Sequence, residues 1–307
     1  MSTVLPDILH RIGNTSLVAL RHVVPAGSAR ILLKLESENP TGSMKDRMAL
    51  AMVEAAEADG RLPADGAVVE YTGGSTGVSL SLVCAVKRHP LHIVTSDAFA
   101  PEKLEHMRRL GAALQIVASD GGRMTEKLTR DMIEAARVIA ERTGAFWTDQ
   151  MKNTDQLAAY HRMADELWRQ TGGRIDAFVQ SVGTAASLRG TSEALRRHDG
   201  RIRIVAVEPA ESAVLSGGPT GAHKIDGVGA GYVVPLWRGN LADRIETVST
   251  DEAGAMARRL AREEGLFGGT STGANVAAAL RLAAELGPAA TVVTVMCDTG
   301  MKYLSRR

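Results

Sequence analysis

Residues 176–190 read DAFVQSVGTAASLRG and contain the sequence pattern from which the fold is predicted. Its first seven residues form an apolar run with little alternation, which is typical of a strand buried on both faces. Gly183 marks a turn, and a helical stretch follows over 184–197. A strand, a glycine-containing turn and a helix, in that order, form the repeating unit of a parallel α/β sheet.

The same order recurs along the whole chain, and no internal repeat or low-complexity linker interrupts it. It predicts an α/β protein whose parallel sheets carry helices on each side. The predicted strands cover 30–37, 67–71, 91–96, 112–118, 176–182, 203–209, 245–249 and 290–296. The predicted helices cover about 44–59, 76–88, 101–110, 121–143, 154–170, 184–197, 251–264 and 272–286.

Composition narrows the class of protein. The 307 residues fit two domains or one large α/β unit, and 45% are hydrophobic, enough for a large core. With 36 Lys+Arg against 35 Asp+Glu, the charge balance indicates no nucleic-acid or membrane partner. No apolar run approaches the ~20 residues that span a bilayer. The N-terminus lacks a signal-peptide pattern, so a cytoplasmic protein is expected.

The cysteines and histidines do not indicate a metal site. Cys84 and Cys297 lie in apolar runs, and the eight histidines show no metal-binding spacing, so no metal is expected.

Glycine-rich loops open several of the predicted helices, at 70–77, 181–190 and 267–275. Open α/β sheets bind ligands beyond the carboxyl ends of their strands, so these loops would build one site. In "GTAAS" (183–187) the backbone N–H groups, with the hydroxyls of Thr184 and Ser187, would hold a phosphate; an ordinary turn is the alternative. The GxxxxGK[ST] pattern is absent, and "GVGAG" (227–231) does not match GxGxxG, so nucleotide binding is not predicted.

A lysine stands at a predicted helix start in "NPTGSMKDR" (39–47). The positive end of a helix disfavours the ammonium form, which leaves two interpretations of Lys45. It is a surface lysine beside a capping box formed by Ser43 and Asp46, or it is a reactive amine that forms a Schiff base with an aldehyde.

Four motifs, in order, resemble those of the cysteine synthase/cystathionine β-synthase family of pyridoxal-phosphate (PLP) enzymes, which have fold type II (tryptophan synthase β-like). They are "NPTGSMKDR", "HKIDGVGAGYVVP" (223–235), "EGLFGGTSTGAN" (264–275) and "DTGMKYLS" (298–305). The resemblance covers about residues 5–305. It implies two open, twisted, mostly parallel sheets flanked by helices. A smaller mobile domain would span 40–145, and a larger PLP-binding domain would combine 1–39 with 146–307.

The resemblance also implies roles for single residues. Lys45 would hold PLP as a Schiff base and move the substrate Cα proton. The cofactor would further contact Ser75, the phosphate-binding residues Gly183, Thr184, Ala185, Ala186 and Ser187, the closely approaching loop at Gly227, and Ser271 at the pyridine nitrogen. The substrate carboxylate would lie against Thr72, Gly73, Gly74, Ser75, Thr76 and Gln150.

The implied reaction is a β-replacement on an O-activated L-serine through an α-aminoacrylate, most simply O-acetyl-L-serine and sulfide giving L-cysteine. A hydroxyl at Ser271 makes the cofactor a weaker electron sink than a carboxylate would, which favours loss of a β-leaving group. The alternatives are β-elimination or a different amino acid or nucleophile, as in cystathionine β-synthase. A more distant one is a catalytically impaired PLP-holding sensor or partner-binding protein. The family is usually homodimeric.

Two loops depart from the family patterns. The substrate loop reads "TGGSTG" where the family has TSGNTG, so Gly73 replaces a serine and Ser75 an asparagine. The phosphate loop reads "GTAAS" in place of GTGGT. Alanine keeps the backbone donors if its φ stays negative, so phosphate binding is expected to survive. The departures leave the amino-acid donor open.

Overall fold

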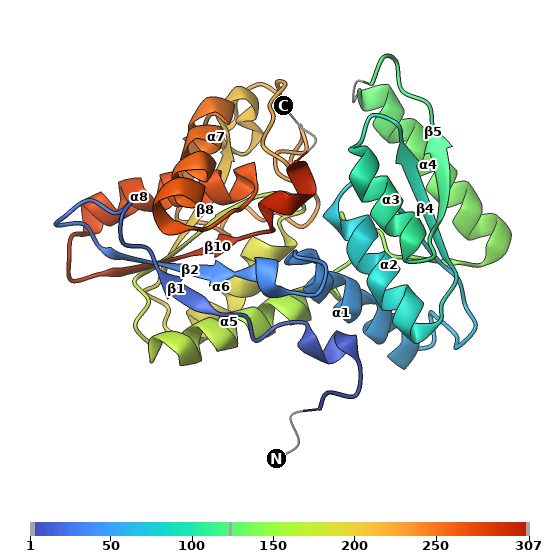
Figure 1. The fold of residues 1–307 in the computed structure, drawn as a ribbon, viewed down its shortest axis with the longest axis horizontal. Helices are drawn as coiled ribbons and strands as arrows, with labels where there is room; N and C mark the ends of the chain where they lie inside the picture. The colour runs from blue at the N-terminus through green and yellow to red at the C-terminus, as the bar shows by residue number, and fades with distance from the viewer. Residues whose placement is uncertain (1–3, 123–124, 305–307) are drawn as a thin grey trace. The chain divides into compact units, whose positions relative to one another are not determined.

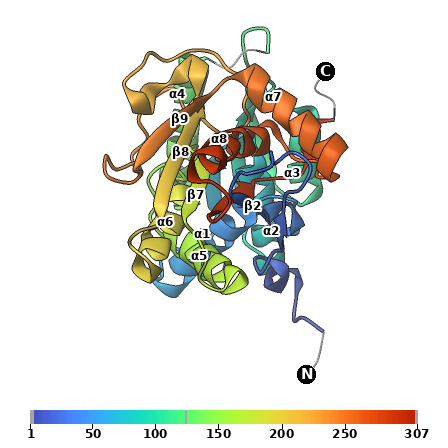
Figure 2. The same ribbon diagram turned by 90° about the vertical axis from the view of Figure 1, so that its left-hand side faces the viewer.

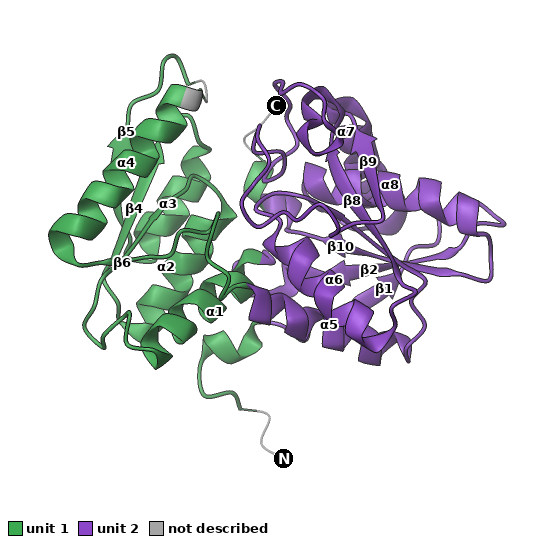
Figure 3. Cartoon of the chain, turned by 180° about the vertical axis from the view of Figure 1, so that it is seen from behind, with its two compact units in different colours: residues 1–12, 45–156, 302–307 green, residues 13–44, 157–301 purple. Residues whose placement is uncertain are grey.

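The computed structural model describes residues 4–122 and 125–304, and the chain divides into two compact units. Unit 1 takes residues 1–12, 45–156 and 302–307, and unit 2 takes residues 13–44 and 157–301 (Figure 3). Each unit has its own sheet. Among the described residues, no helix combines the length and the apolar character needed to cross a membrane.

Unit 1 is built on a four-stranded parallel sheet in the order β5-β4-β3-β6. Alternate strand residues face opposite sides, so Val68 and Ile93 meet helices α1, α2 and α3 while Val69 and Val94 meet α4 (Figure 1). The strands are β3 (Val68–Tyr71), β4 (Leu91–Ser96), β5 (Ala113–Val117) and β6 (Phe146–Trp147). The helices are α1 (Lys45–Ala58), α2 (Ser75–Lys87), α3 (Pro101–Arg109) and α4 (Glu126–Thr143).

Unit 2 is built on a six-stranded sheet in the order β1-β2-β10-β7-β8-β9, parallel except for the β1–β2 pair. Helices α7 and α8 cover one face, and α5 and α6 lie together on the other (Figures 1 and 2). The strands are β1 (Leu17–Ala19), β2 (Arg30–Leu35), β7 (Ala177–Ser181), β8 (Arg203–Pro209), β9 (Arg244–Val248) and β10 (Thr291–Met296). The helices are α5 (Leu157–Thr171), α6 (Ala186–His198), α7 (Thr250–Arg259) and α8 (Thr270–Leu286).

Short helical turns lie between these elements. They are Ile8–Arg11, Glu36–Glu38, Ala210–Ser212, Val214–Ser216, Leu260–Glu264 and Gly300–Tyr303. The predicted α/β class, with two mostly parallel sheets flanked by helices, is confirmed.

The predicted strands and helices are found close to their predicted bounds, with one exception. Helix α4 begins at Glu126 and not at 121, because Gly121 and Gly122 take positive φ values of 60° and 74° that a right-handed helix does not allow. Residues 123–124 lie outside the described residues. Strands β1 and β6 were not predicted; at three and two residues they are too short to show a pattern.

The two units differ in their bounds from the predicted domains of 40–145 and 1–39 plus 146–307. The N-terminal turn belongs to unit 1 because Leu9 and Ile12 pack into the cluster formed by α1, α2 and α3. The end of the C-terminal turn, from Lys302 on, belongs there too, since the ammonium of Lys103 lies 4.2 Å from the ring centre of Tyr303. Part of the predicted C-terminal motif, Ser305, lies outside the described residues.

Candidate active site

Lys45 is the first residue of α1 and follows Met44, where the first segment of unit 2 ends. Its neighbour Asp46 is fully buried and accepts a 2.6 Å hydrogen bond from Ser79 Oγ of α2. The carboxylate therefore ties α1 to α2, a contact that the predicted capping role did not include. Ser43 pairs with Asp298 in an isolated bridge just before the helix.

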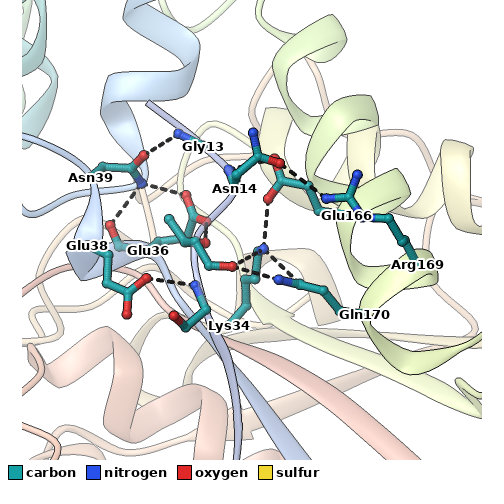
Figure 4. A network of polar contacts seen from close by, with 11 residues as sticks. Gly13, Asn14, Lys34, Glu36, Glu38, Asn39, Glu166, Arg169 and Gln170 are labelled. Carbon is teal, nitrogen blue, oxygen red and sulfur yellow. Dashed lines mark hydrogen bonds and ion pairs between the residues drawn. The ribbon is translucent and has the colours of Figure 1, made fainter. Parts of the chain in front are cut away.

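The turn that leads to Lys45 starts from a buried polar network in unit 2 (Figure 4). Asn39, the first residue of the lysine motif, donates from Nδ2 to Glu36 Oε2 at 2.8 Å and accepts from the Gly13 N–H at 2.8 Å. Below it, the Lys34 ammonium lies 2.7 Å from Glu166 Oε2 and donates to Thr15 O at 2.7 Å. The network fixes where the motif begins.

Within unit 1, the predicted substrate loop joins β3 to α2. Residues 72–74 form the turn, and α2 begins at Ser75. Thr72 Oγ1 accepts from the Gly74 N–H at 3.2 Å, and Thr76 Oγ1 donates to Gln150 Oε1 at 2.7 Å. The structure thus brings the two predicted carboxylate-binding elements, the loop and Gln150, side by side.

A buried glutamate holds this arrangement together. Glu70 of β3 accepts hydrogen bonds from Thr148 Oγ1 at 2.6 Å, the Gln150 N–H at 3.0 Å and the Tyr71 N–H at 2.9 Å. Burial, the largest cause, raises the pKa of its carboxyl to about 7. The three donors lower this pKa and the nearby Asp149 raises it, each by less than burial does. Glu70 therefore fixes the backbone position of Gln150 relative to β3.

Within unit 2, the predicted phosphate loop joins β7 to α6. A Cβ on Gly183 would lie 2.3 Å from the carbonyl oxygen of Gly227, so only glycine fits there. The Gly229 N–H donates to Val182 O at 2.9 Å, which holds the 227–229 segment against the loop. The structure thereby places Gly183 and Gly227 in close contact.

The backbone conformation of Ala185 differs from the negative φ that was expected for alanine in the phosphate loop. Its φ is +70°, in the left-handed region, and not negative as assumed. A non-glycine residue there costs roughly 1–2 kcal/mol, because its Cβ crowds the following carbonyl. Ala186 follows as the first residue of α6. The loop therefore carries backbone strain at one residue, where glycine would carry none.

The phosphate loop presents donors to a ligand. Within residues 4–122 and 125–304, the backbone N–H groups of Gly183, Thr184 and Ala185 have no acceptor in the protein. Ser187 Oγ accepts from Gln180 Nε2 at 3.0 Å, so its own proton points elsewhere. These donors stand at the positive end of α6, which is 13 residues long.

Ser271 lies in the first turn of α8 and is buried. The side chain of Thr270 accepts from the Asp226 N–H at 3.0 Å, which joins this helix start to the Gly227 segment. Deeper in α8, Asn275 accepts from the Ser181 N–H at 2.6 Å and donates to Val295 O at 2.8 Å. The start of α8, the Gly227 segment and the end of β7 are thus pinned together.

These contacts test whether the residues of unit 2 fit PLP. A phosphate monoester dianion needs several N–H and O–H donors at a positive helix end, and the 183–187 loop supplies them. Ser271, in the adjoining α8 start, offers a neutral hydroxyl to a pyridine ring and not a carboxylate. The donor set fits the cofactor.

Several supporting residues were missed from the sequence. Lys34, Glu36, Glu70 and Asn275 are buried polar residues inside apolar runs. That mismatch was the available signal, because a buried charge or amide needs a partner. Their partners come from distant parts of the chain, such as Thr148 for Glu70, and so could not be named.

Comparison with known proteins places the chain in a family. The model of the family described as "Pyridoxal-phosphate dependent enzyme" matches residues 8–298. The chain is 38% identical over 301 residues to a cysteine synthase of Staphylococcus aureus (strain Mu50 / ATCC 700699), covering 97% of this chain and 95% of that protein.

Two solved structures extend the likeness. The cysteine synthase (OASS) of Entamoeba histolytica superposes with a TM-score of 0.93 at 35% identity, covering 99% of this chain and 90% of the other. An O-acetylserine-dependent cystathionine β-synthase from Helicobacter pylori gives 0.91 at 29% identity, covering 100% and 99%. The chain therefore belongs to the pyridoxal-phosphate-dependent enzyme family and is a PLP-dependent enzyme of fold type II.

Proposed function

We propose that this enzyme is a cysteine synthase, which converts O-acetyl-L-serine and sulfide into L-cysteine and acetate. The observation that carries the proposal is the phosphate loop of unit 2, whose unbonded N–H groups lie at the start of α6 and against Gly227. The cysteine synthase relative, which matches nearly the full length, supports the reaction class.

The reaction balances without an oxidant or a metal. A base removes the Cα proton, the Cβ–O bond breaks with its electron pair and acetate leaves. Sulfide then forms the Cβ–S bond, and a proton returns to Cα. When bound, PLP supplies the electron withdrawal that makes the Cα proton acidic.

Lys45 would hold PLP covalently through Nζ, and the amine freed when the substrate binds would take and return the Cα proton. One lysine is enough for both transfers, because the proton removed in the first half is needed in the second. Its place on the first turn of α1 supports this role, since the positive helix end disfavours the ammonium form.

The phosphate would be held by Gly183, Thr184, Ala185, Ala186 and Ser187. Gly227 would line the cofactor with backbone alone. Ser271 would meet the pyridine nitrogen with a hydroxyl, which does not stabilise a protonated ring as a carboxylate does. That choice favours departure of the β-substituent.

The substrate carboxylate would lie at the start of α2, where N–H groups and the helix dipole favour an anion. Thr72, Gly73, Gly74, Ser75 and Thr76 would surround it, and Ser75 would also approach the cofactor. Gln150, fixed by Thr76 and by Glu70, would add a side-chain amide.

The test combines absorbance with product formation. The PLP-loaded protein receives O-acetyl-L-serine, which should change the visible absorbance of the cofactor, and sulfide should then restore it and yield cysteine. Lys45→Ala should lose turnover and the lysine-linked absorbance. A cofactor that responds to another β-substituted amino acid, and not to O-acetyl-L-serine, would contradict the substrate assignment.

A second candidate uses the same amino acid with a different nucleophile. The Helicobacter pylori neighbour is an O-acetylserine-dependent cystathionine β-synthase, and this chain covers nearly all of it. Homocysteine in place of sulfide would give cystathionine. Competition between the two thiols, with both products measured, would decide between them.

We also propose that the enzyme acts as a homodimer in the cytoplasm. The support for the dimer is the family resemblance, and the compartment is the one expected from the sequence. Light scattering of the purified protein and cell fractionation would test the two statements.

A further inference from the structure

At Gly73 of the substrate loop there is no room for a side chain, because the ring of Phe99 occupies the space. A Cβ built on Gly73 would lie 1.8 Å from two ring carbons of Phe99 and 2.2 Å from a third. These are the carbons nearest the backbone of Phe99, so a small tilt of the ring tip does not relieve the clash. Real Cβ contacts never come this close, and the ring itself fills the place of a side chain at position 73.

The topology of unit 1 brings the two residues together. Strands β3 and β4 are parallel neighbours in which Tyr71 pairs with Val94, so the segments after both strands emerge at the same sheet edge. The Thr72 N–H donates to Val94 O at 2.9 Å, and the Phe99 N–H donates to Ser96 O at 3.2 Å. The second bond turns the chain after β4 back over the loop after β3.

The Phe99 ring is held by neighbouring hydrophobic residues and is also partly exposed. Phe99 packs against both hydrophobic clusters of unit 1 while remaining only half-buried, whereas Gly73 is buried. The neighbouring Gly74 has open space around its missing Cβ. The tight fit is therefore specific to position 73 and is not a general property of the loop.

We propose that Phe99 is a specificity-determining residue for the amino-acid substrate, because its ring takes the space of a side chain at position 73. The loop then meets the substrate with bare backbone at Gly73 and an apolar ring beside it. A ring offers contact area but no hydrogen-bond donor, so it suits an O-acyl substituent better than a charged one. This inference rests on the proposed function, since it assumes that the loop binds an amino acid.

The experiment is a double-mutant cycle on the PLP-loaded enzyme with Gly73→Ser, Phe99→Ala and the pair together. Gly73→Ser alone should lower kcat/KM for O-acetyl-L-serine by about tenfold or more, since overpacking displaces the loop. Phe99→Ala should restore most of that loss, so that the effects couple and do not add. Gly74→Ser should show no coupling to Phe99→Ala, because its side chain meets open space.

The preference between two substrates distinguishes a role of Phe99 in specificity from a role in folding alone, which would change both activities equally. The ratio of kcat/KM for O-acetyl-L-serine over O-phospho-L-serine should fall about tenfold in the double variant, which exchanges the ring for a hydroxyl donor. Phe146→Ala removes another half-buried ring of unit 1 and should leave the ratio unchanged.

The possible results distinguish an error in the proposed function from an error in the role of Phe99. If the wild-type cofactor responds to no amino acid, the proposed function is wrong and this inference falls with it. If the wild type responds but the effects of Gly73→Ser and Phe99→Ala simply add, or both substrates lose activity equally, only the role of Phe99 is overturned.

Discussion

Replacing Glu70 by glutamine should change how the stability of the enzyme depends on pH. The carboxyl is completely buried, and burial raises its pKa from an ordinary 4.5 to about 7. The folded protein therefore holds a proton on Glu70, between pH 4.5 and 7, that the unfolded chain releases. Linkage then makes the free energy of unfolding fall as pH rises through this window.

The size of the effect follows from the two pKa values. The gap between 4.5 and about 7 corresponds to roughly 3 kcal/mol, since one pKa unit is about 1.4 kcal/mol. Roughly 2–3 kcal/mol of it should appear between pH 5 and pH 8. Glutamine does not ionise, so the Glu70→Gln variant lacks this contribution at any pH.

Urea unfolding at several pH values measures the prediction. The free energy of unfolding of the wild type, minus that of Glu70→Gln, should fall by roughly 2–3 kcal/mol from pH 5 to pH 8. The exposed Glu54 of the neighbouring helix α1 offers a matched Glu→Gln variant that does not touch the buried carboxyl. A difference for Glu70→Gln that stays flat from pH 5 to pH 8 would show that the Glu70 carboxyl is ionised throughout, and that its three donors outweigh burial.

The remaining predictions concern the phosphate loop of unit 2 and the helix α8 beside it. Gly183→Ala should weaken PLP binding by tenfold or more, measured by cofactor absorbance during dialysis, because its Cβ would lie 2.3 Å from Gly227 O; unchanged retention would contradict the close approach. Asn275→Ala should lower the free energy of unfolding by about 2–3 kcal/mol, since it leaves the buried Ser181 N–H and Val295 O unpaired; a loss below about 0.5 kcal/mol would argue against those bonds. Ala185→Gly should be at least about 1 kcal/mol less destabilising than Ala186→Gly, because only Ala185 has a positive φ; equal losses in urea unfolding would show no strain.

The fold was predictable because its signal is local. Runs such as 203–209 and 290–296 are rich in β-branched and other apolar residues, and each is followed or preceded by a helical stretch, so both element types could be placed from short windows. The unit bounds were not predictable in the same way. Leu9 and Tyr303 join unit 1 through contacts with segments far along the chain, and no local pattern marks them.

In the candidate site, too, some residues were predictable from the sequence and others were not. Lys45, the 183–187 loop and Gln150 were named through the family resemblance. Within unit 1 the structure brings Gln150 beside the substrate loop, and within unit 2 it brings Gly183 beside Gly227. Glu70 belongs to none of the four motifs, and Asn275 ends one of them without a predicted role, because the importance of both lies in which distant backbone groups they bind. The φ of Ala185 was also hidden, since alanine ordinarily indicates a negative value.

The two loops that depart from the family pattern have adapted in different ways. At Ala185 the backbone has a left-handed conformation although the residue carries a side chain, so the phosphate loop carries strain at this position. At Gly73 a side chain is lost, and the ring of Phe99 occupies the vacated space. Strained backbone conformations cluster at ligand-binding sites, which agrees with a phosphate-binding role for this loop. A neighbouring ring that fills the gap changes the chemistry offered to the ligand. We therefore expect variation in substrate choice to depend on residues 73 and 99, while residues 183–187 bind the same cofactor whichever amino acid reacts.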